Sequence, residues 1–160
     1  MPRKDKDNFA PRILNRRAMH DYFIEAKIEC GIVLQGSEVK SLRMGTAQLN
    51  ESFARVERGE LVLHGCHIDP YKQASLYNHE PKRERKLLLH RSEIDELLGR
   101  TKAKGQTIVP LRLYLNPRGR AKVELALARG KQLHDRRRDI ADRESKRDIE
   151  RQLADAQRGR

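Results

Sequence analysis

The chain has 160 residues with 35 Lys and Arg against 23 Asp and Glu, which gives a formal net charge of +12 at pH 7. This excess of positive charge indicates a polyanionic partner, most simply nucleic acid. No window approaches the roughly 20 apolar residues that span a bilayer, and the N-terminus MPRKDKDNFAPR carries no hydrophobic signal region. Two cysteines, Cys30 and Cys66, are too few for a disulfide framework. We therefore expect a cytoplasmic protein with no membrane partner.

Three segments differ in composition. Residues 1–14 form a basic N-terminal arm, residues 15–129 have the size of one domain, and residues 130–160 form a basic tail. The tail has no aromatic residue, and its few large apolar residues are Leu133, Ile140, Ile149 and Leu153. Their spacing does not make one stripe that a helix could bury, so ordering the isolated tail would cost more entropy than burial returns. We expect the tail to be disordered when free and to fold into a helix on a polyanionic partner.

The first elements of the domain are a strand and a short helix. Residues 18–34, AMHDYFIEAKIECGIVL, mix β-branched and aromatic residues with partial alternation, which predicts one long, half-buried strand. Residues 37–45, SEVKSLRMG, fit a short helix whose Val39 and Leu42 point inward at i and i+3. The charged residues of this helix are expected at the surface: Glu38, Lys40 and Arg43.

Most of the remaining elements are strands. Residues 52–58 and 61–68 predict a hairpin joined by Gly59-Glu60. Residues 86–100, KLLLHRSEIDELLGR, hold a short strand and then a helix capped by Ser92. Two more strands, TIVPLRLYLN and RAKVELALA, are linked by the turn Asn116-Pro117-Arg118-Gly119. About six strands and two or three short helices indicate a mainly β protein with a closed or partly open barrel.

A catalytic alternative rests on His64, Cys66 and His67. Strand alternation would put His64 and Cys66 on one face, as a metal or nucleophile site requires. The sequence offers neither a CxxC nor an HxxxH pair to complete a zinc site, and no Gly-rich phosphate loop. His134 beside Asp135 could mimic an acid–base pair, but a flexible tail cannot hold catalytic geometry. We therefore expect no enzyme, no metal, no cofactor and no small-molecule substrate.

Three motifs resemble one known family. They are NRRAMHDYFIEAKIECGIVLQGSEVKSLR (15–43), RERKLLLHRSEIDELLGR (83–100) and GKQLHDRRRDI (130–140). In this order they resemble the small protein B family, the SsrA-binding proteins of bacterial trans-translation. The resemblance implies an oligonucleotide-binding-fold barrel that binds the tRNA-like domain of transfer-messenger RNA and delivers it to ribosomes stalled without a stop codon. It also implies small-subunit ribosomal RNA and, through the charged RNA, elongation factor Tu as partners.

The resemblance also implies RNA-contact positions at Asn15, Glu29 and Leu88. An amide can pair with a base edge, a carboxylate can accept from exocyclic amines, and a leucine can pack on an unstacked base. From the residues alone, a turn Asn, a solvated Glu and a core Leu are the simpler interpretations. Clustered cations that could neutralise phosphates complete the predicted site, although each could be an ordinary solvated charge. They are Arg16, Arg17, Lys40, Arg43, Arg83, Arg85 and Lys86.

In the tail, GKQLHDRR resembles the family's Gly-Lys-Lys-x-x-Asp-Lys-Arg motif. Gln132 departs from this motif, and Arg136 replaces a Lys with its charge kept. The resemblance implies that the tail folds inside the empty messenger channel, where phosphate contacts would offset its ordering entropy. The predicted ribosome-binding residues are Lys131, His134, Asp135, Arg136 and Arg137. The alternative is a generic RNA chaperone or ribosome-associated RNA-binding protein that binds any RNA in a salt-sensitive way.

Overall fold

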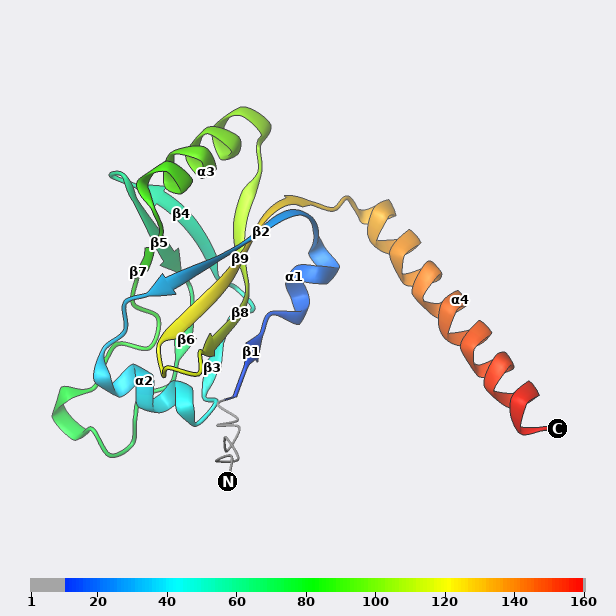
Figure 1. The fold of residues 1–160 in the computed structure, drawn as a ribbon, viewed down its shortest axis with the longest axis horizontal. Helices are drawn as coiled ribbons and strands as arrows, with labels where there is room; N and C mark the ends of the chain where they lie inside the picture. Colours follow the sequence, from blue (N-terminus) through cyan, green and yellow to red (C-terminus); the bar gives the residue numbers. More distant parts are fainter. Residues whose placement is uncertain (1–10, 160) are drawn as a thin grey trace, which may run out of the picture. The chain divides into compact units, whose positions relative to one another are not determined.

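The computed structural model describes residues 11–159 (Figure 1). Residues 1–10, which make up most of the predicted basic arm, lie outside the described residues. The chain divides into two compact units, residues 1–129 and residues 130–160. The first unit holds all the strands of the described chain, and the second holds a single helix.

Six strands of the first unit close into a ring. Their order is β8-β4-β5-β7-β2-β9, and a further pairing of β9 with β8 closes the barrel. A short strand β1 (Ile13–Leu14) adds to β8, and β3 (Ala47–Gln48) pairs with β6 (His67–Ile68). The structure therefore confirms the predicted mainly β, oligonucleotide-binding-fold-like barrel, and the barrel is closed. The six strands are β2 (Tyr22–Ile32), β4 (Phe53–Glu57), β5 (Glu60–His64), β7 (Arg85–Leu88), β8 (Thr107–Leu115) and β9 (Ala121–Gly130).

Two hairpins follow the predicted pattern with small shifts. Strands β8 and β9 pair across the predicted turn, and their register changes between Pro110 and Arg112. A proline has no N–H for the ladder, so an irregularity at this point is expected. Strands β4 and β5 pair with Glu57 opposite Glu60, so the turn residues lie one position earlier than predicted.

Between residues 11 and 129, four short helical segments accompany the strands: α1 (Arg16–Asp21), α2 (Gly36–Arg43), η1 (Ser75–Tyr77) and α3 (Arg91–Lys104). The predicted strand from residue 18 is wrong at its start, because the Asn15 side chain accepts a hydrogen bond from the Ala18 N–H at 3.1 Å and begins α1. Helix α3 is capped by His90 rather than by the predicted Ser92. There the His90 N–H donates to the Glu93 carboxylate at 3.0 Å in a capping box.

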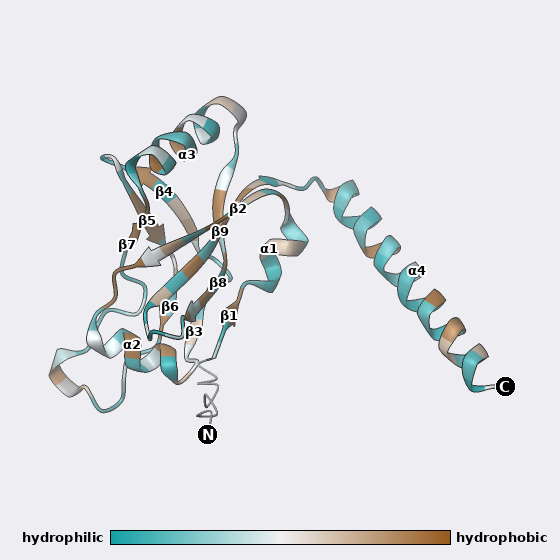
Figure 2. Ribbon diagram, viewed as in Figure 1, coloured by the Kyte–Doolittle hydropathy of each residue, from teal (hydrophilic) through white to brown (hydrophobic). Residues whose placement is uncertain are grey.

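The core fills the barrel and extends under two helices. Figure 2 shows hydrophobic residues along the strands. Leu61 and Leu63 of β5 are fully buried, as alternation along a half-buried strand requires. Leu42 of α2 is also fully buried, in agreement with the predicted inward face of that helix. A smaller cluster lies between α1 and the outside of the sheet, and it contains Ala18, Val109, Leu111, Ala126 and Ala128.

The second unit is one helix, α4 (Leu133–Arg158). Its first turn is stabilised by a capping box, in which the Gln132 N–H donates to the Asp135 carboxylate at 3.3 Å, and by an ion pair between Lys131 and Asp139. The structure thus does not show the disorder predicted for the free tail. Ile149 lies nine residues, or two and a half turns, beyond Ile140, so the apolar residues do not form a single stripe. None of the described helices is long and apolar enough to cross a membrane.

Candidate nucleic-acid interface

Three of the predicted RNA-binding residues lie on one outer face of the barrel. Strands β2 and β7 pair antiparallel with Gly31 opposite Leu88. Side chains of a strand alternate between its faces, and Glu29, Lys86 and Leu88 all point outward and are exposed. The sheet register therefore brings together residues that are nearly sixty positions apart in the chain. We call this surface the β2–β7 face.

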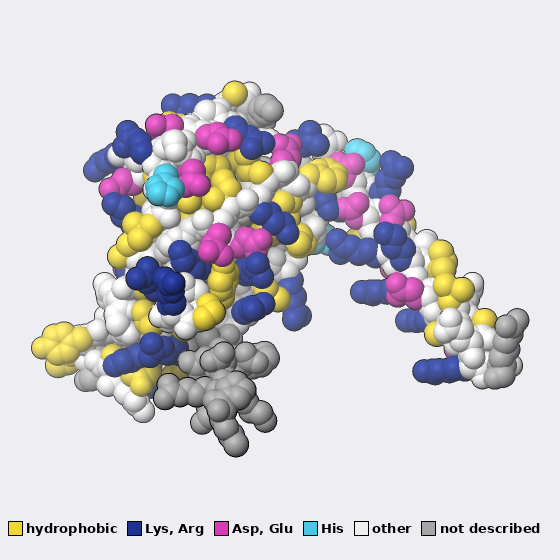
Figure 3. All heavy atoms as spheres, in the orientation of Figure 1, with side chains coloured by type: hydrophobic (Ala, Val, Ile, Leu, Met, Phe, Trp, Pro, Cys, Tyr) yellow, Lys and Arg dark blue, Asp and Glu magenta, His cyan; other side chains and the backbone are white. Residues whose placement is uncertain are grey.

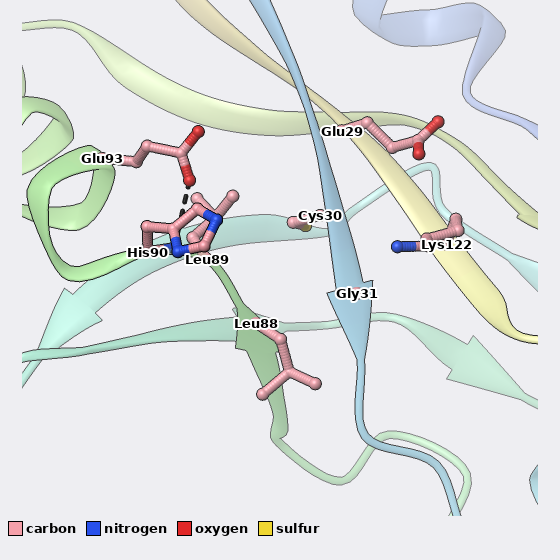
Figure 4. A pocket seen from close by; sticks show the side chains of 8 residues that line it. All are labelled: Glu29, Cys30, Gly31, Leu88, Leu89, His90, Glu93 and Lys122. Carbon is pink, nitrogen blue, oxygen red and sulfur yellow. Dashed lines mark hydrogen bonds between the residues drawn. The ribbon is translucent and has the colours of Figure 1, made fainter.

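A groove of about 410 Å³ lies on this face. Figure 4 shows Leu88 and Glu29 on either side of β2, with Lys122 of β9 beyond that strand. The Leu88 side chain is 50 % exposed. A Cβ on Gly31 would lie 3.3 Å from the Leu88 Cβ, so a glycine at this position leaves room for Leu88 to lie across β2. The groove is lined by Glu29, Cys30, Gly31, Leu88, Leu89, His90, Glu93 and Lys122.

Tyr114 and Lys122 belong to the same surface, although no sequence motif indicated them. The Tyr114 hydroxyl donates to the Glu29 carboxylate, and Tyr114 lies opposite Lys122 in the β8–β9 register. Burial and the hydrogen bond to Glu29 raise the pKa of Tyr114 to about 12, so the phenol stays protonated at neutral pH. The Arg112 guanidinium lies 5.3 Å from the centre of the Tyr114 ring. The groove therefore combines an apolar surface, a carboxylate and an ammonium group, and the Tyr114 ring lies beside it through its contact with Glu29.

Cys30 lines the groove, but its thiol is not a reactive nucleophile. Its thiol donates to the Val123 carbonyl at 3.5 Å and is buried. Burial raises the pKa of Cys30 to about 12, so the thiol is protonated at neutral pH and is a poor nucleophile.

Arg85 and Glu38 are buried, which corrects two predictions. Both side chains are fully buried, whereas Arg85 was predicted to contact RNA and Glu38 was predicted at the surface. Arg85 and Arg83 both bind the Glu38 carboxylate, with N–O distances of 3.0 Å from Arg85 Nη2 and 2.5 Å from Arg83 Nε. Charge clustering in the sequence could not reveal this, because the partner lies on another element.

The network around Glu38 is completed by backbone groups. Arg85 also donates to the carbonyls of Cys66 at 2.6 Å and Pro81 at 3.0 Å. Burial alone would raise the pKa of Glu38. The hydrogen bonds from Arg83 and the Gln35 N–H, together with the charge of Arg85, outweigh it, so the pKa of Glu38 is lowered. The network thus joins α2 to the segment before β7.

Asn15 is likewise a buried residue. Asn15 is 4 % exposed, and its Nδ2 donates to the carbonyls of Leu49 at 3.1 Å and Pro110 at 2.9 Å. Both amide hydrogens are therefore used inside the protein, and a direct contact from this amide to a base edge does not fit. Arg16 and Arg17, the next two residues, are exposed on α1, where Arg17 pairs with Asp21 at 3.3 Å.

The other predicted cations lie on α2 and on the segment before β7. Lys40 and Arg43 are exposed on α2, and the Lys40 ammonium lies 5.3 Å from the centre of the Tyr71 ring. Arg83 is partly exposed and also donates to the Val33 carbonyl at 3.3 Å. Arg83 therefore connects α2 to the chain just after β2, at the edge of the β2–β7 face.

The predicted ribosome-binding residues lie at the start of the tail helix. His134 contacts Asp135 at 3.1 Å, and Asp135 is also the acceptor of the capping box that begins α4. Arg136 and Arg137 follow in the first turns of the same helix. The carboxylate of Asp135 therefore has a local role in starting the helix.

His64, Cys66 and His67 do not form one site. His64 contacts Glu57 at 2.8 Å, and Cys66 is fully buried. Gly65 has φ +71°, and a Cβ there would lie 2.7 Å from the Glu51 carbonyl oxygen. The chain therefore turns between His64 and Cys66, and the prediction that these two side chains share a strand face is wrong. Among residues 11–159, no group of three or more His, Cys, Asp or Glu side chains is placed to hold a metal ion.

The closed barrel and its grooved sheet face belong to the class of oligonucleotide-binding-fold-like β-barrels. A family model described as SmpB protein matches residues 12–155, so the chain belongs to the SmpB family.

Two curated relatives are both named SsrA-binding protein. The protein of Moorella thermoacetica is 57 % identical over 144 residues, which cover 90 % of this chain and 93 % of the relative. The protein of Bacillus subtilis is 54 % identical over 145 residues, which cover 91 % and 92 %. A solved structure described as "tmRNA-SmpB: a journey to the center of the bacterial ribosome" matches with a TM-score of 0.66 and 54 % identity, and covers 78 % of this chain and 87 % of that chain.

Proposed function

We propose that this chain is an RNA-binding adaptor that binds the tRNA-like domain of transfer-messenger RNA and delivers it to stalled ribosomes. Membership of the SmpB family and the names of the relatives support the RNA and the ribosome as partners. The observation that carries the proposal is the convergence of Glu29, Lys86 and Leu88 on the β2–β7 face. The function is binding and delivery rather than catalysis.

The groove suits an RNA loop with unstacked bases. Leu88 offers an apolar surface on which a base can pack, and the Glu29 carboxylate can accept from an exocyclic amine. Lys122, which lines the groove, and Lys86, which is exposed on the same β7 strand as Leu88, can neutralise phosphates. Arg85 and Asn15 act indirectly, because they hold β7 and α1 in place from inside the protein.

The tail is proposed to act on the ribosome. Lys131 lies just before helix α4, and Arg136 and Arg137 lie in its first turns. These cations can contact phosphates of small-subunit ribosomal RNA in the empty messenger channel. Elongation factor Tu would take part through the charged RNA rather than through this chain. The whole process would take place in the cytoplasm, where the ribosomes are.

Gel-shift titration against the tRNA-like domain, with an unrelated structured RNA as competitor, tests the proposal. Leu88→Ala should weaken binding by about threefold to tenfold, because Leu88 is 50 % exposed and RNA can newly bury only about half of a leucine side chain. The matched control is Leu14→Ala, because Leu14 is 52 % exposed and lies on β1, outside the groove. Equal affinity for both RNAs, or equal effects of the two variants, would favour the generic RNA chaperone instead.

A further inference from the structure

The loop from residue 69 to residue 84 is tightly held at its base. The Asn78 amide donates to the Tyr71 carbonyl at 2.8 Å and accepts from the Tyr71 N–H at 3.0 Å, which ties the two sides of the loop together. His79 is 5 % exposed and bridges the Ser37 hydroxyl at 2.8 Å and the Ile68 carbonyl at 2.9 Å. The loop therefore has a fixed base on α2 and β6.

The tip of the same loop exposes two large apolar side chains. Leu76 is 91 % exposed and Tyr77 is 90 % exposed, whereas the next most exposed large apolar residue within 11–159, Leu133, is 65 % exposed. Figure 3 shows apolar side chains projecting from the molecule where Figure 1 draws this loop. Neither side chain can contribute much to folding, since burial of apolar surface is what stabilises a fold. A fixed base with an exposed aromatic tip is suited to contact a partner.

The loop is continuous with the β2–β7 face. Arg85 of β7 donates to the Pro81 carbonyl at 3.0 Å, and Arg83 donates to the Val33 carbonyl just after β2. Next to the loop, the Lys40 ammonium lies over the Tyr71 ring. These contacts hold the base of the loop beside the start of β7 and the end of β2, with the cations of α2 next to it.

We propose that Tyr77 stacks on an unpaired base of the same RNA that occupies the β2–β7 face, with Leu76 packed beside it. This proposal rests on the proposed function. An RNA is favoured over a protein partner because the chain carries a net charge of +12 and exposed cations, Lys40 and Arg43, lie on the adjoining helix. Every base has a π-face, so an aromatic side chain at a loop tip can bind a splayed base of any identity.

The chain contains no tryptophan, which makes a direct test available. In the full-length Tyr77→Trp variant the single indole reports on position 77 alone, and addition of the tRNA-like domain should quench its fluorescence in step with binding. Leu153→Trp, at a residue 59 % exposed on α4, is the control and should show no such quenching. Quenching by ribosomes but not by the tRNA-like domain, or no quenching while the RNA is bound, would overturn the proposal.

Affinity provides a second test. Tyr77→Ala should weaken binding of the tRNA-like domain by about fivefold to 100-fold, whereas Tyr77→Phe, which keeps the ring, should stay within about twofold. Thermal stability should not change in either variant, because the side chain is almost fully exposed. If the wild type does not bind the RNA, the proposed function fails. If Leu88→Ala weakens binding and Tyr77→Ala does not, only the role of the loop tip is refuted.

Discussion

The sharpest prediction contrasts two neighbouring residues of β7, Arg85 and Lys86. Both are cations in the cluster that the sequence assigns to RNA. Arg85 is fully buried on the Glu38 carboxylate, whereas Lys86 points outward, with a side chain 48 % exposed and 2.7 Å from Glu60. Replacing each by alanine removes the same formal charge. The two variants should nevertheless differ completely in their effects.

For Arg85→Ala the magnitude follows from what the guanidinium contacts. The substitution leaves the buried Glu38 carboxylate with Arg83 as its remaining ion-pair partner and leaves the Cys66 and Pro81 carbonyls without this donor. Removing one partner of a buried ion pair costs about 3 to 5 kcal/mol. This is a large share of a domain's total stability of about 5 to 15 kcal/mol. For Lys86→Ala the loss is below about 1 kcal/mol, because the pair with Glu60 is exposed to solvent.

Urea unfolding and salt-dependent RNA binding measure the two effects separately. Arg85→Ala should lower the free energy of unfolding and leave the slope of log affinity against log salt unchanged, with binding measured where the variant is still folded. Lys86→Ala should leave stability nearly unchanged and reduce that slope by about one, as one lost phosphate contact does. A reduced slope in Arg85→Ala with unchanged stability would refute the reasoning, because it would mean that the guanidinium is reached by the RNA.

The pKa of Glu38 is lowered from its ordinary value of 4.5. Its ionised carboxylate therefore stabilises the fold above pH 4.5, and this stabilisation is lost as the pH falls through the lowered pKa. In urea unfolding, the free energy of unfolding of Glu38→Gln should therefore fall less on acidification than that of the wild type. Gly31→Ala should weaken RNA binding in gel shifts with little change in melting temperature, because the new Cβ would lie 3.3 Å from the Leu88 side chain and displace it. Unchanged affinity would contradict the role of the groove. Glu144→Pro should leave RNA binding intact and abolish peptide tagging on stalled ribosomes, because a proline inside α4 destabilises the helix by about 3 kcal/mol or more. Full tagging activity would rule out a helical tail as the active form.

Much of the fold could be read from local patterns. Alternation located the strands from residue 107 to residue 128, and the i, i+3 spacing placed Leu42 in the core. The start of β2 was predicted wrongly because residues 18–21 are compatible with a strand by composition. What makes them helical is the Asn15 side chain, whose cap depends on a polar contact that periodicity does not record. Residue types thus predict elements better than they predict where elements begin.

The candidate site was predictable only in part, because it depends on which strands of the barrel pair. Glu29 and Leu88 came from the resemblance to a family, and the face that joins them depends on which strands pair. Tyr114 and Lys122 were missed because the sequence predicts the β8–β9 hairpin but not that β9 lies beside β2, which alternation along one strand cannot indicate. Strand alternation does indicate which residues share a face once the register is known. Long-range pairing is therefore the information that the sequence pattern lacked.

The position of Arg85 connects the buried network to both proposed contacts. Its guanidinium binds Glu38 of α2 and the carbonyl of Pro81, and its backbone lies in β7 three residues before Leu88. One buried cation thus ties the helix that carries Lys40, the base of the loop that exposes Tyr77 and the strand that carries Leu88. Because a buried charge without partners is strongly destabilising, these three segments cannot separate without exposing Arg85 and Glu38 to solvent or leaving one of them buried and unpaired. A rigid arrangement of this kind lowers the ordering entropy that binding a structured RNA would otherwise require.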